Sequence, residues 1–406
     1  MMRVRLIFAV LSVCLCACAQ ADCPQGDLNN DCRIDAADLR VLAEAWLGDA
    51  NTPADLNRDG HVNQADLAVV AAAWGRTGCP IVINEVLAHA HANAPDWIEL
   101  HNLSGLPVDI GGWTLSDRKD DLGRFQIAAG TILEPFGYIV FYENTHFGNA
   151  LNPDTRTPFA LSENGETLYL FSGDDEAYPN YLAEAPLGPS ETFTSFGRYR
   201  KSTGEYSYVT MSELTPGMAN AYPRVGPVVI NEIMYHPAGD ADAEYVELLN
   251  IDEGPVTLFD FISMEPWRFR DDSGIDFRFP SDDPVTLEKG EYLLLVKDAV
   301  AVRQRGVRAG VRMMPWGSGK LANQGEHLYL LKPGDVDLAG TRYWIEVDRV
   351  DYSDGGHPEN FANNIDPWPA PADGLGLSLN RLFTRKYGND PNNWQATIPT
   401  PGSAND

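Results

Sequence analysis

Short oxygen-bearing side chains recur at a fixed spacing in two segments near the N-terminus. They occupy positions 1, 3, 5, 9 and 12 of a twelve-residue stretch, and position 7 offers its backbone carbonyl. In the first segment, loop one, these residues are Asp27, Asn29, Asp31, Arg33, Asp35 and Asp38. In loop two they are Asp55, Asn57, Asp59, His61, Asn63 and Asp66. Hard oxygen ligands in this order suit calcium, which takes six to eight of them at about 2.3–2.6 Å. We therefore predict two calcium ions.

Two other loop positions predict the course of the backbone. Position 8 is aliphatic in both loops (Ile34 and Val62), and we expect these residues to pair the loops through a short β contact. Position 6, where the chain turns sharply with φ > 0, is Gly60 in loop two but Cys32 in loop one. A residue with a Cβ costs about 1–2 kcal/mol in that conformation. We therefore expect loop one to be strained and loop two to be regular.

One amphipathic helix is predicted after each loop, over residues 36–47 and 64–74. The apolar residues at i, i+3, i+4 and i+7 are Leu39, Leu42, Ala43 and Trp46, then Leu67, Val70, Ala71 and Trp74. An entering helix has no room before either loop, so each unit is a loop–helix half. Paired loop–helix halves with Asp at position 12 resemble the type I dockerin, the calcium-dependent module that docks into cohesin.

The resemblance covers Asp27 to about Gly75. It implies calcium binding residue by residue, and a protein partner that is cohesin-like or another envelope protein. Dockerins recognise cohesin largely through positions 10 and 11, which are typically hydroxyl residues. Here those positions are Ala36 and Ala37, then Gln64 and Ala65, so the resemblance does not identify the partner.

Length, composition and charge limit the number of domains and the kinds of partner that the chain can have. A chain of 406 residues suggests two or three domains, and 44% hydrophobic residues supply enough material for their cores. The net charge of −28 disfavours nucleic acid and anionic membrane surfaces as partners. We expect no transmembrane segment, because the one strongly apolar run, Leu6 to Leu15, is too short to span a bilayer.

That run forms the centre of a predicted signal peptide, residues 1–21. Arg3 and Arg5 precede it, and Ala19-Gln20-Ala21 is an A-x-A cleavage site. We expect an exported protein of the extracellular space or cell surface of a bacterium. An alternative is a lipobox ending at Cys18, which would tether the protein by a lipid.

Cys23, Cys32 and Cys79 remain after cleavage, and an oxidising compartment favours a disulfide between two of them. Cys23 and Cys79 bracket the calcium module, so Cys23–Cys79 is our first expectation. Cys23–Cys32 is the alternative.

After Cys79 the sequence predicts short strands separated by turns, and the same β domain occurs twice. Four motifs recur: Ile81–Val86 as Val228–Ile233, Trp97–Asn102 as Tyr245–Asn250, Gly165–Leu170 as Gly325–Leu330, and Thr215–Asn220 as Thr400–Asn405. With Gly112–Asp117 in the first copy, these motifs resemble the lamin tail domain, an immunoglobulin-like β-sandwich. In the second copy, residues 259–264 stand where that motif is expected, and residues 298–320 read as an inserted loop.

The predicted fold class is therefore mainly β: two immunoglobulin-like β-sandwiches preceded by a small all-α module. The domains are residues 22–79, 80–222 and 227–406. Of the other candidates for chemistry, the repeated acids Glu85, Glu99, Glu232 and Glu247 are interpreted as structural, since both copies carry both. His89, His91 and His101 are interpreted as polar loop residues rather than a zinc site. Aromatic residues of copy two are either core or a sugar platform: Trp316, Tyr343, Trp344, Trp368 and Trp394.

No catalytic motif is recognised, so we expect an exported, calcium-binding, non-catalytic interaction protein. One alternative is a component of a polysaccharide-degrading assembly with a glycan-binding sandwich. The other is a hydrolase with one catalytic sandwich.

Overall fold

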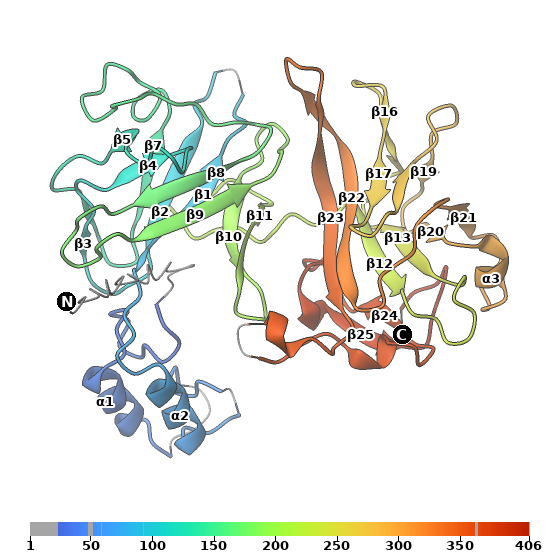
Figure 1. Ribbon diagram of the computed structural model, residues 1–406, viewed down its shortest axis with the longest axis horizontal. Helices are drawn as coiled ribbons and strands as arrows, with labels where there is room; N and C mark the ends of the chain where they lie inside the picture. The colour runs from blue at the N-terminus through green and yellow to red at the C-terminus, as the bar shows by residue number, and fades with distance from the viewer. Residues whose placement is uncertain (1–22, 48–51, 58, 92, 362–363, 406) are drawn as a thin grey trace, which may run out of the picture. The chain divides into compact units, whose positions relative to one another are not determined.

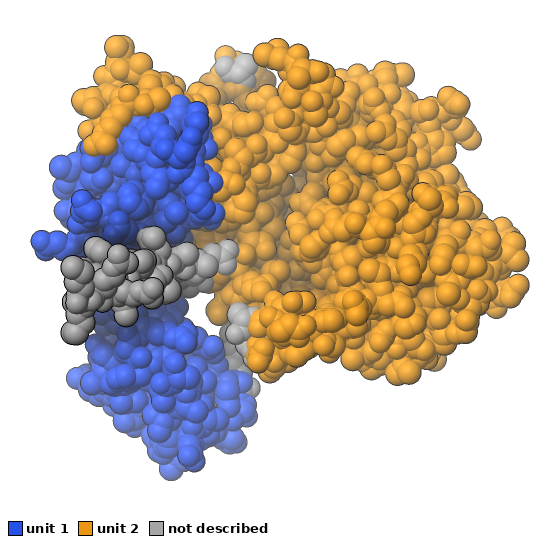
Figure 2. Space-filling view, in the orientation of Figure 1, with its two compact units in different colours: residues 1–82, 101–137, 169–184 blue, residues 83–100, 138–168, 185–406 orange. Residues whose placement is uncertain are grey.

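The computed structural model describes residues 23–405 apart from 48–51, 58, 92 and 362–363. The chain divides into two compact units (Figure 2). Unit 1 comprises residues 1–82, 101–137 and 169–184, and unit 2 comprises residues 83–100, 138–168 and 185–406. The predicted signal peptide and Cys18 lie outside the described residues. No helix in the described part of the chain has the length and apolar content needed to cross a membrane.

The N-terminal part of the described chain contains two short helices, α1 (Ala36–Glu44) and α2 (Gln64–Ala72) (Figure 1). Each helix directly follows a predicted calcium loop. Each helix begins where predicted and ends two or three residues early. A small core with Leu42 and Val70 at its centre joins the two halves. Trp46 and Trp74 lie beyond the helix ends and are 40% and 50% exposed, so their placement on the apolar face was wrong.

Copy one (residues 81–220) contributes strands to both units. They are β1 Ile81–Leu87, β2 Trp97–Asn102, β3 Val108–Asp109, β4 Thr114–Ser116, β5 Phe125–Gln126, β6 Ile132–Leu133, β7 Tyr138–Tyr142, β8 Glu166–Phe171, β9 Leu182–Leu187, β10 Phe196–Arg200 and β11 Tyr206–Thr210. The sheet orders are β11-β10-β1-β2-β7, β5-β4-β8-β9 and β3-β6. The two larger sheets give copy one its mainly β character.

Copy two (residues 228–405) lies entirely in unit 2. Its elements are β12 Val228–Met234, β13 Tyr245–Asn250, β14 Val256–Thr257, β15 Phe259–Asp260, β16 Glu265–Pro266, β17 Arg268–Arg270, β18 Asp276–Arg278, β19 Thr286–Leu287, β20 Tyr292–Val296, α3 Ala299–Arg303, β21 Arg312–Pro315, β22 Gly325–Val336, β23 Arg342–Ser353, η1 Pro358–Asn360, η2 Ala370–Ala372, β24 Ser378–Arg381, η3 Pro391–Asn393 and β25 Trp394–Thr397. Two large sheets, β21-β20-β13-β12-β24-β25 and β18-β17-β22-β23, share one continuous apolar core, as expected of a two-layer sandwich. Residues 298–320, which we expected to form a loop, contain α3 and β21 instead, and β21 pairs in parallel with β20.

The Gly112–Asp117 motif of copy one has a counterpart in copy two. That counterpart lies further along the chain than residues 259–264, where it was expected. The backbone N–H of Trp113 donates to Ile110, and that of Trp267 donates to Leu258 in the same way (3.1 and 3.0 Å). Two residues separate the first pair and eight the second. The additional residues form the hairpin β15–β16, at whose tip Ile262 is 95% exposed. Residues 259–264 are therefore an insertion and not a degenerate motif.

The repeated acids of copy one close its sheet onto the final turn. Glu85 and Glu99 are fully buried. Glu85 accepts hydrogen bonds from the hydroxyls of Ser195 (2.5 Å) and Thr215 (2.6 Å), while Glu99 accepts one from the backbone N–H of Gly217. The first two strands thus hold the Thr-Pro-Gly turn that ends the copy.

Copy two repeats the arrangement with its own residues. Glu232 accepts from the N–H of Thr400 (3.1 Å), and Glu247 accepts from Asn231 (2.8 Å) and from the N–H of Gly402 (2.6 Å). Both acids are fully buried. Because every one of the four carboxylates is inside and hydrogen-bonded, the structural interpretation of these acids agrees with the structure.

We call these four acids and the turns that they hold the acid clasp. Burial makes two of the acids, Glu99 and Glu247, sensitive to pH. It raises the pKa of Glu99 to about 7 and that of Glu247 to about 8. A carboxyl group whose pKa is higher in the folded state stabilises the fold at low pH and loses that contribution as the pH rises through the folded value. We therefore expect the melting temperature to fall between about pH 5 and pH 8.5. In Glu247→Gln that fall should be smaller, even if the variant is less stable throughout.

The matched control is Glu253→Gln, since Glu253 is exposed and pairs with Lys289 and Arg385 at the surface. It should leave the pH dependence of the melting temperature unchanged. A Glu247→Gln variant whose melting temperature changes with pH as steeply as that of the wild type would contradict the prediction.

Candidate metal centre

The side chains of loop one fold back onto their own backbone. Asp27 accepts the N–H of Asp31 (3.1 Å) through Oδ1 and the N–H of Cys32 (2.8 Å) through Oδ2. Asp31 in turn accepts the N–H of Arg33 (2.9 Å). These bonds wind positions 1 to 7 into a tight turn and hold the carboxylates of positions 1 and 5 in fixed orientations.

Loop two has the same pattern, residue for residue. Asp55 accepts the N–H groups of Asp59 (3.2 Å) and Gly60 (3.1 Å), and Asp59 accepts that of His61 (2.9 Å). Positions 3 and 5 are also joined in both loops, since the Asn57 amide donates to Asp59 (2.8 Å) as Asn29 donates to Asp31 (2.9 Å). Two sequences that differ at several positions therefore adopt one loop geometry.

The acid at position 12 links each loop to its helix. Asp66 is fully buried and accepts the N–H groups of Leu56 (2.7 Å), Asn57 (3.2 Å) and Asn63 (2.8 Å). Burial raises its pKa, but these N–H groups outweigh burial and lower the pKa overall. Asp66 is thereby kept in the ionised form that a metal ligand requires. Asp38 accepts the equivalent hydrogen bonds in loop one.

Position 9 caps the helix as well as lying in the ligand order. Asp35 accepts the N–H of Ala37 (2.7 Å) and Asn63 that of Ala65 (2.8 Å), and each helix start forms a capping box with the acid at position 12. Loop and helix are therefore specified by the same two side chains. This explains why the helices begin where the sequence predicted.

Position 6 has positive φ in both loops, at +61° for Cys32 and +92° for Gly60. The expected strain in loop one is therefore located at Cys32, a residue with a Cβ in the left-handed region. Asn30, at position 4 of the same loop, is also left-handed at +60°. Asparagine tolerates this conformation better than most residues.

Two sequence predictions about the module were wrong. Ile34 and Val62 do not pair with each other: Ile34 exchanges backbone hydrogen bonds with Gly75 and Arg76, and Val62 accepts one from Leu47. Each loop thus pairs with the segment after the other helix. The disulfide joins Cys23 to Cys32, not to Cys79, which is buried.

The donor set fits calcium. Each predicted side-chain ligand is an Asp or Asn, which offers a carboxylate or amide oxygen. Loop one offers four carboxylates and loop two offers three. Burial raises the pKa of Asp27, and the like charges of Asp31 and Asp38 add to this effect. A divalent cation would relieve that repulsion. Asp27 also lies near the sulfur atoms of Cys23 and Cys32, but their bond to each other excludes a thiolate site.

The predicted histidine loop offers no comparable set. His89 contacts the carbonyl of Ser190 (3.0 Å) and the hydroxyl of Thr192 (3.1 Å), and His91 stacks on Phe193. Burial lowers the pKa of His101 to about 4. Among the described residues, these histidines belong to no group close enough to share a metal ion.

The aromatic residues of copy two are divided between core and surface. Trp316, Trp368 and Trp394 are buried in the core, whereas Tyr343 and Trp344 are half-buried. The five therefore do not form one exposed platform.

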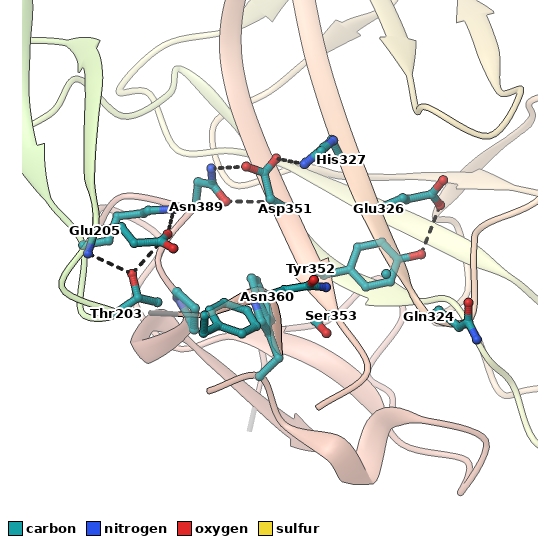
Figure 3. A pocket seen from close by; sticks show the side chains of 15 residues that line it. Thr203, Glu205, Gln324, Glu326, His327, Asp351, Tyr352, Ser353, Asn360 and Asn389 are labelled. Atoms are coloured by element: carbon teal, nitrogen blue, oxygen red, sulfur yellow. Dashed lines mark hydrogen bonds and ion pairs between the residues drawn. The ribbon is translucent and has the colours of Figure 1, made fainter. Parts of the chain in front are cut away.

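The sequence did not predict a cavity of about 350 Å³ in unit 2 (Figure 3). Two of its carboxylates are Glu326, whose pKa burial raises to about 7, and Asp351, which Asn389 holds (2.7 Å). In the β22–β23 register Glu326 is opposite Tyr352, and His327 is opposite Asp351. Because successive residues of a strand face opposite sides, Glu326 and Asp351 belong to opposite faces of this strand pair, although both line the cavity.

Comparison with known families agrees with both resemblances. The Lamin Tail Domain model matches residues 76–181 and 223–354, which is more than half of the chain. The Dockerin type I domain model matches residues 25–73. No curated protein and no solved structure matches the chain. The assignment of a type I dockerin followed by two lamin tail domains is thereby confirmed.

The loop geometry predicts the effect of a side chain at position 6 of loop two. Gly60→Ala places a Cβ at φ +92°, which costs about 1–2 kcal/mol. We expect calcium to stabilise this variant less than the wild type, measured as the shift in melting temperature on adding calcium. Gly254→Ala is the control, because a Cβ there meets open space. Equal calcium-induced shifts in Gly60→Ala and the wild type would contradict the prediction.

Proposed function

Given that the chain belongs to the lamin tail domain family and carries a type I dockerin domain, we propose that it is an exported, calcium-binding, non-catalytic docking protein. Loops one and two would hold one calcium ion each. The dockerin would engage a protein partner, and the two immunoglobulin-like domains would act as spacers or present their loops to a surface.

The observation that carries the proposal is the set of backbone hydrogen bonds that the two loops share. In each, one acid accepts the N–H groups of positions 5 and 6, and a second, buried acid accepts those of positions 2, 3 and 9. Such a loop holds side-chain oxygens at positions 1, 3, 5 and 12 in the order that calcium requires. When bound, the ion would neutralise the clustered charge.

Calcium would act on the fold of the module as well as on its charge. Its core is small, with seven buried apolar residues drawn from the two short helices, the loops and the segments beside them. Binding energy of a metal that the unfolded chain does not hold becomes folding energy. The helices, and with them any docking surface, would form fully only when calcium is present.

The partner is a protein, cohesin-like or another envelope protein, and the exposed residues that follow the loops bear on which. Positions 10 and 11 are exposed in both halves, as Ala36 and Ala37 and as Gln64 and Ala65. These side chains offer no hydroxyl to hydrogen-bond a partner, so recognition at these positions would depend on apolar contact by the three alanines and on the amide of Gln64. A glycan-binding sandwich within a polysaccharide-degrading assembly, or a hydrolase, are the alternatives.

Calorimetric titration of the full chain tests the proposal. We expect two calcium ions per chain, and a gain of helical circular dichroism that excess EGTA reverses. Asp59→Ala should lower the stoichiometry to one ion, because it removes the position-5 ligand of loop two. Glu44→Gln is the control, since this exposed acid of α1 pairs only with Arg40. Titration without heat, with identical spectra in calcium and EGTA, would refute the proposal.

Docking is tested separately from calcium binding. Retention of the chain on immobilised cohesin in calcium, lost in EGTA, would identify the partner class. Retention on a polysaccharide that survives deletion of residues 22–78 would favour the glycan alternative, and turnover of a polysaccharide would favour the hydrolase.

A further inference from the structure

The disulfide encloses the first half of loop one. Cys23 precedes the loop and Cys32 is its position 6, so the ring they close contains positions 1, 3 and 5: Asp27, Asn29 and Asp31. The bridged residues are nine apart in sequence. Half of the ligand order therefore lies inside one small covalent ring.

The bridge also lies next to a ligand atom. The N–H of Cys32 donates to Oδ2 of Asp27 at 2.8 Å, and the Asp27 carboxylate lies within 4.8 Å of both sulfur atoms. The residue that carries the bridge thus also fixes the orientation of the first ligand. Any movement of Cys32 would move Asp27.

Loop two shows what the bridge replaces. Its position 6 is Gly60, which donates the equivalent hydrogen bond to Asp55 (3.1 Å) at φ +92°. Glycine reaches that conformation without steric cost, whereas Cys32 at φ +61° does not. In loop one, a covalent bond stands where loop two has a glycine.

We propose that Cys23 and Cys32 are positioning residues for the first calcium site. Their bond holds Cys32 in the left-handed conformation and Asp27, Asn29 and Asp31 in ligand orientation. The calcium affinity of loop one therefore depends on the oxidation state of this pair, and that of loop two does not. The inference rests on the proposed function, because it requires that the loops bind calcium.

Reduction of the disulfide allows calcium binding to be compared between the oxidised and the reduced Cys23–Cys32 pair. A dithiol supplies two electrons and two protons: the Cys23–Cys32 sulfur bond breaks, two S–H bonds form, and the dithiol closes to its own disulfide. Cys32 can then leave the left-handed region in the metal-free loop. Calcium binding must restore that conformation, so it becomes weaker.

The coupling must be reciprocal. If the closed bridge tightens calcium binding by some factor, bound calcium favours the closed bridge by the same factor. Calcium should therefore protect Cys23–Cys32 from reduction at equilibrium. This readout does not depend on the docking of a partner.

Calcium titration of full-length variants in competition with a chromophoric chelator tests the proposal. Relative to the wild type, Cys23→Ala/Cys32→Ala should weaken one of the two binding constants by about 5- to 30-fold, which corresponds to about 1–2 kcal/mol. Cys23→Ala/Cys32→Gly should recover most of that loss, because glycine restores the turn without a bridge. The other constant should stay unchanged in both.

The second measurement follows alkylation of Cys23 by mass spectrometry after equilibration in graded dithiothreitol. We expect calcium to raise the dithiothreitol concentration needed for half reduction, relative to EGTA. Circular dichroism of each variant in saturating calcium checks that the module is folded.

The outcomes separate this inference from the proposed function. If no variant and no wild type binds calcium, the proposed function fails and the inference fails with it. If two ions bind with the same constants in the wild type and in Cys23→Ala/Cys32→Ala, only the inference is overturned. Failure of Cys23→Ala/Cys32→Gly to recover affinity would overturn the role assigned to the backbone of Cys32.

Discussion

A buried carboxylate must be surrounded by hydrogen-bond donors, and this constraint shapes every domain of the chain. An isolated ionised acid is too costly to bury. Asp38 and Asp66 meet this constraint with backbone N–H groups of their own loops. Glu85 and Glu232 meet it with donors that include the N–H groups of Thr215 and Thr400, more than a hundred residues away. In both settings the acid determines the path of the backbone around it.

The consequence differs because the donors differ. In the loops the donors are local, so the acid organises the dozen residues of its own loop. In the sandwiches the donors include N–H groups of the last turn, so the acid closes the domain. The same residue type thus builds the loops of the proposed metal centre at the N-terminus and a structural clasp in each sandwich.

The sequence allowed the local features to be predicted and not those that depend on the tertiary path. While the ligand order stays a prediction, both helix starts and the left-handed Cys32 follow from spacing and capping within one loop. The partner of Ile34 does not, because it is set by how the two halves pack. Cys23–Cys79 was expected first because these residues bracket the module, with Cys23–Cys32 as the alternative. The chain turns back within loop one and brings Cys32 to Cys23.

The duplication provides a measure of what the fold itself requires. Thr114 and Ser116 of β4 have the same register against β8 as Arg268 and Arg270 of β17 have against β22. In copy two the guanidinium of Arg270 lies over the ring of Tyr329 (5.5 Å). These arginines are therefore not needed to build the sheet. The acids of the clasp, by contrast, recur at both places with the same partners. What the two copies share maintains the sandwich, and what separates them, including the exposed β15–β16 hairpin, is where copy two can have acquired a task of its own.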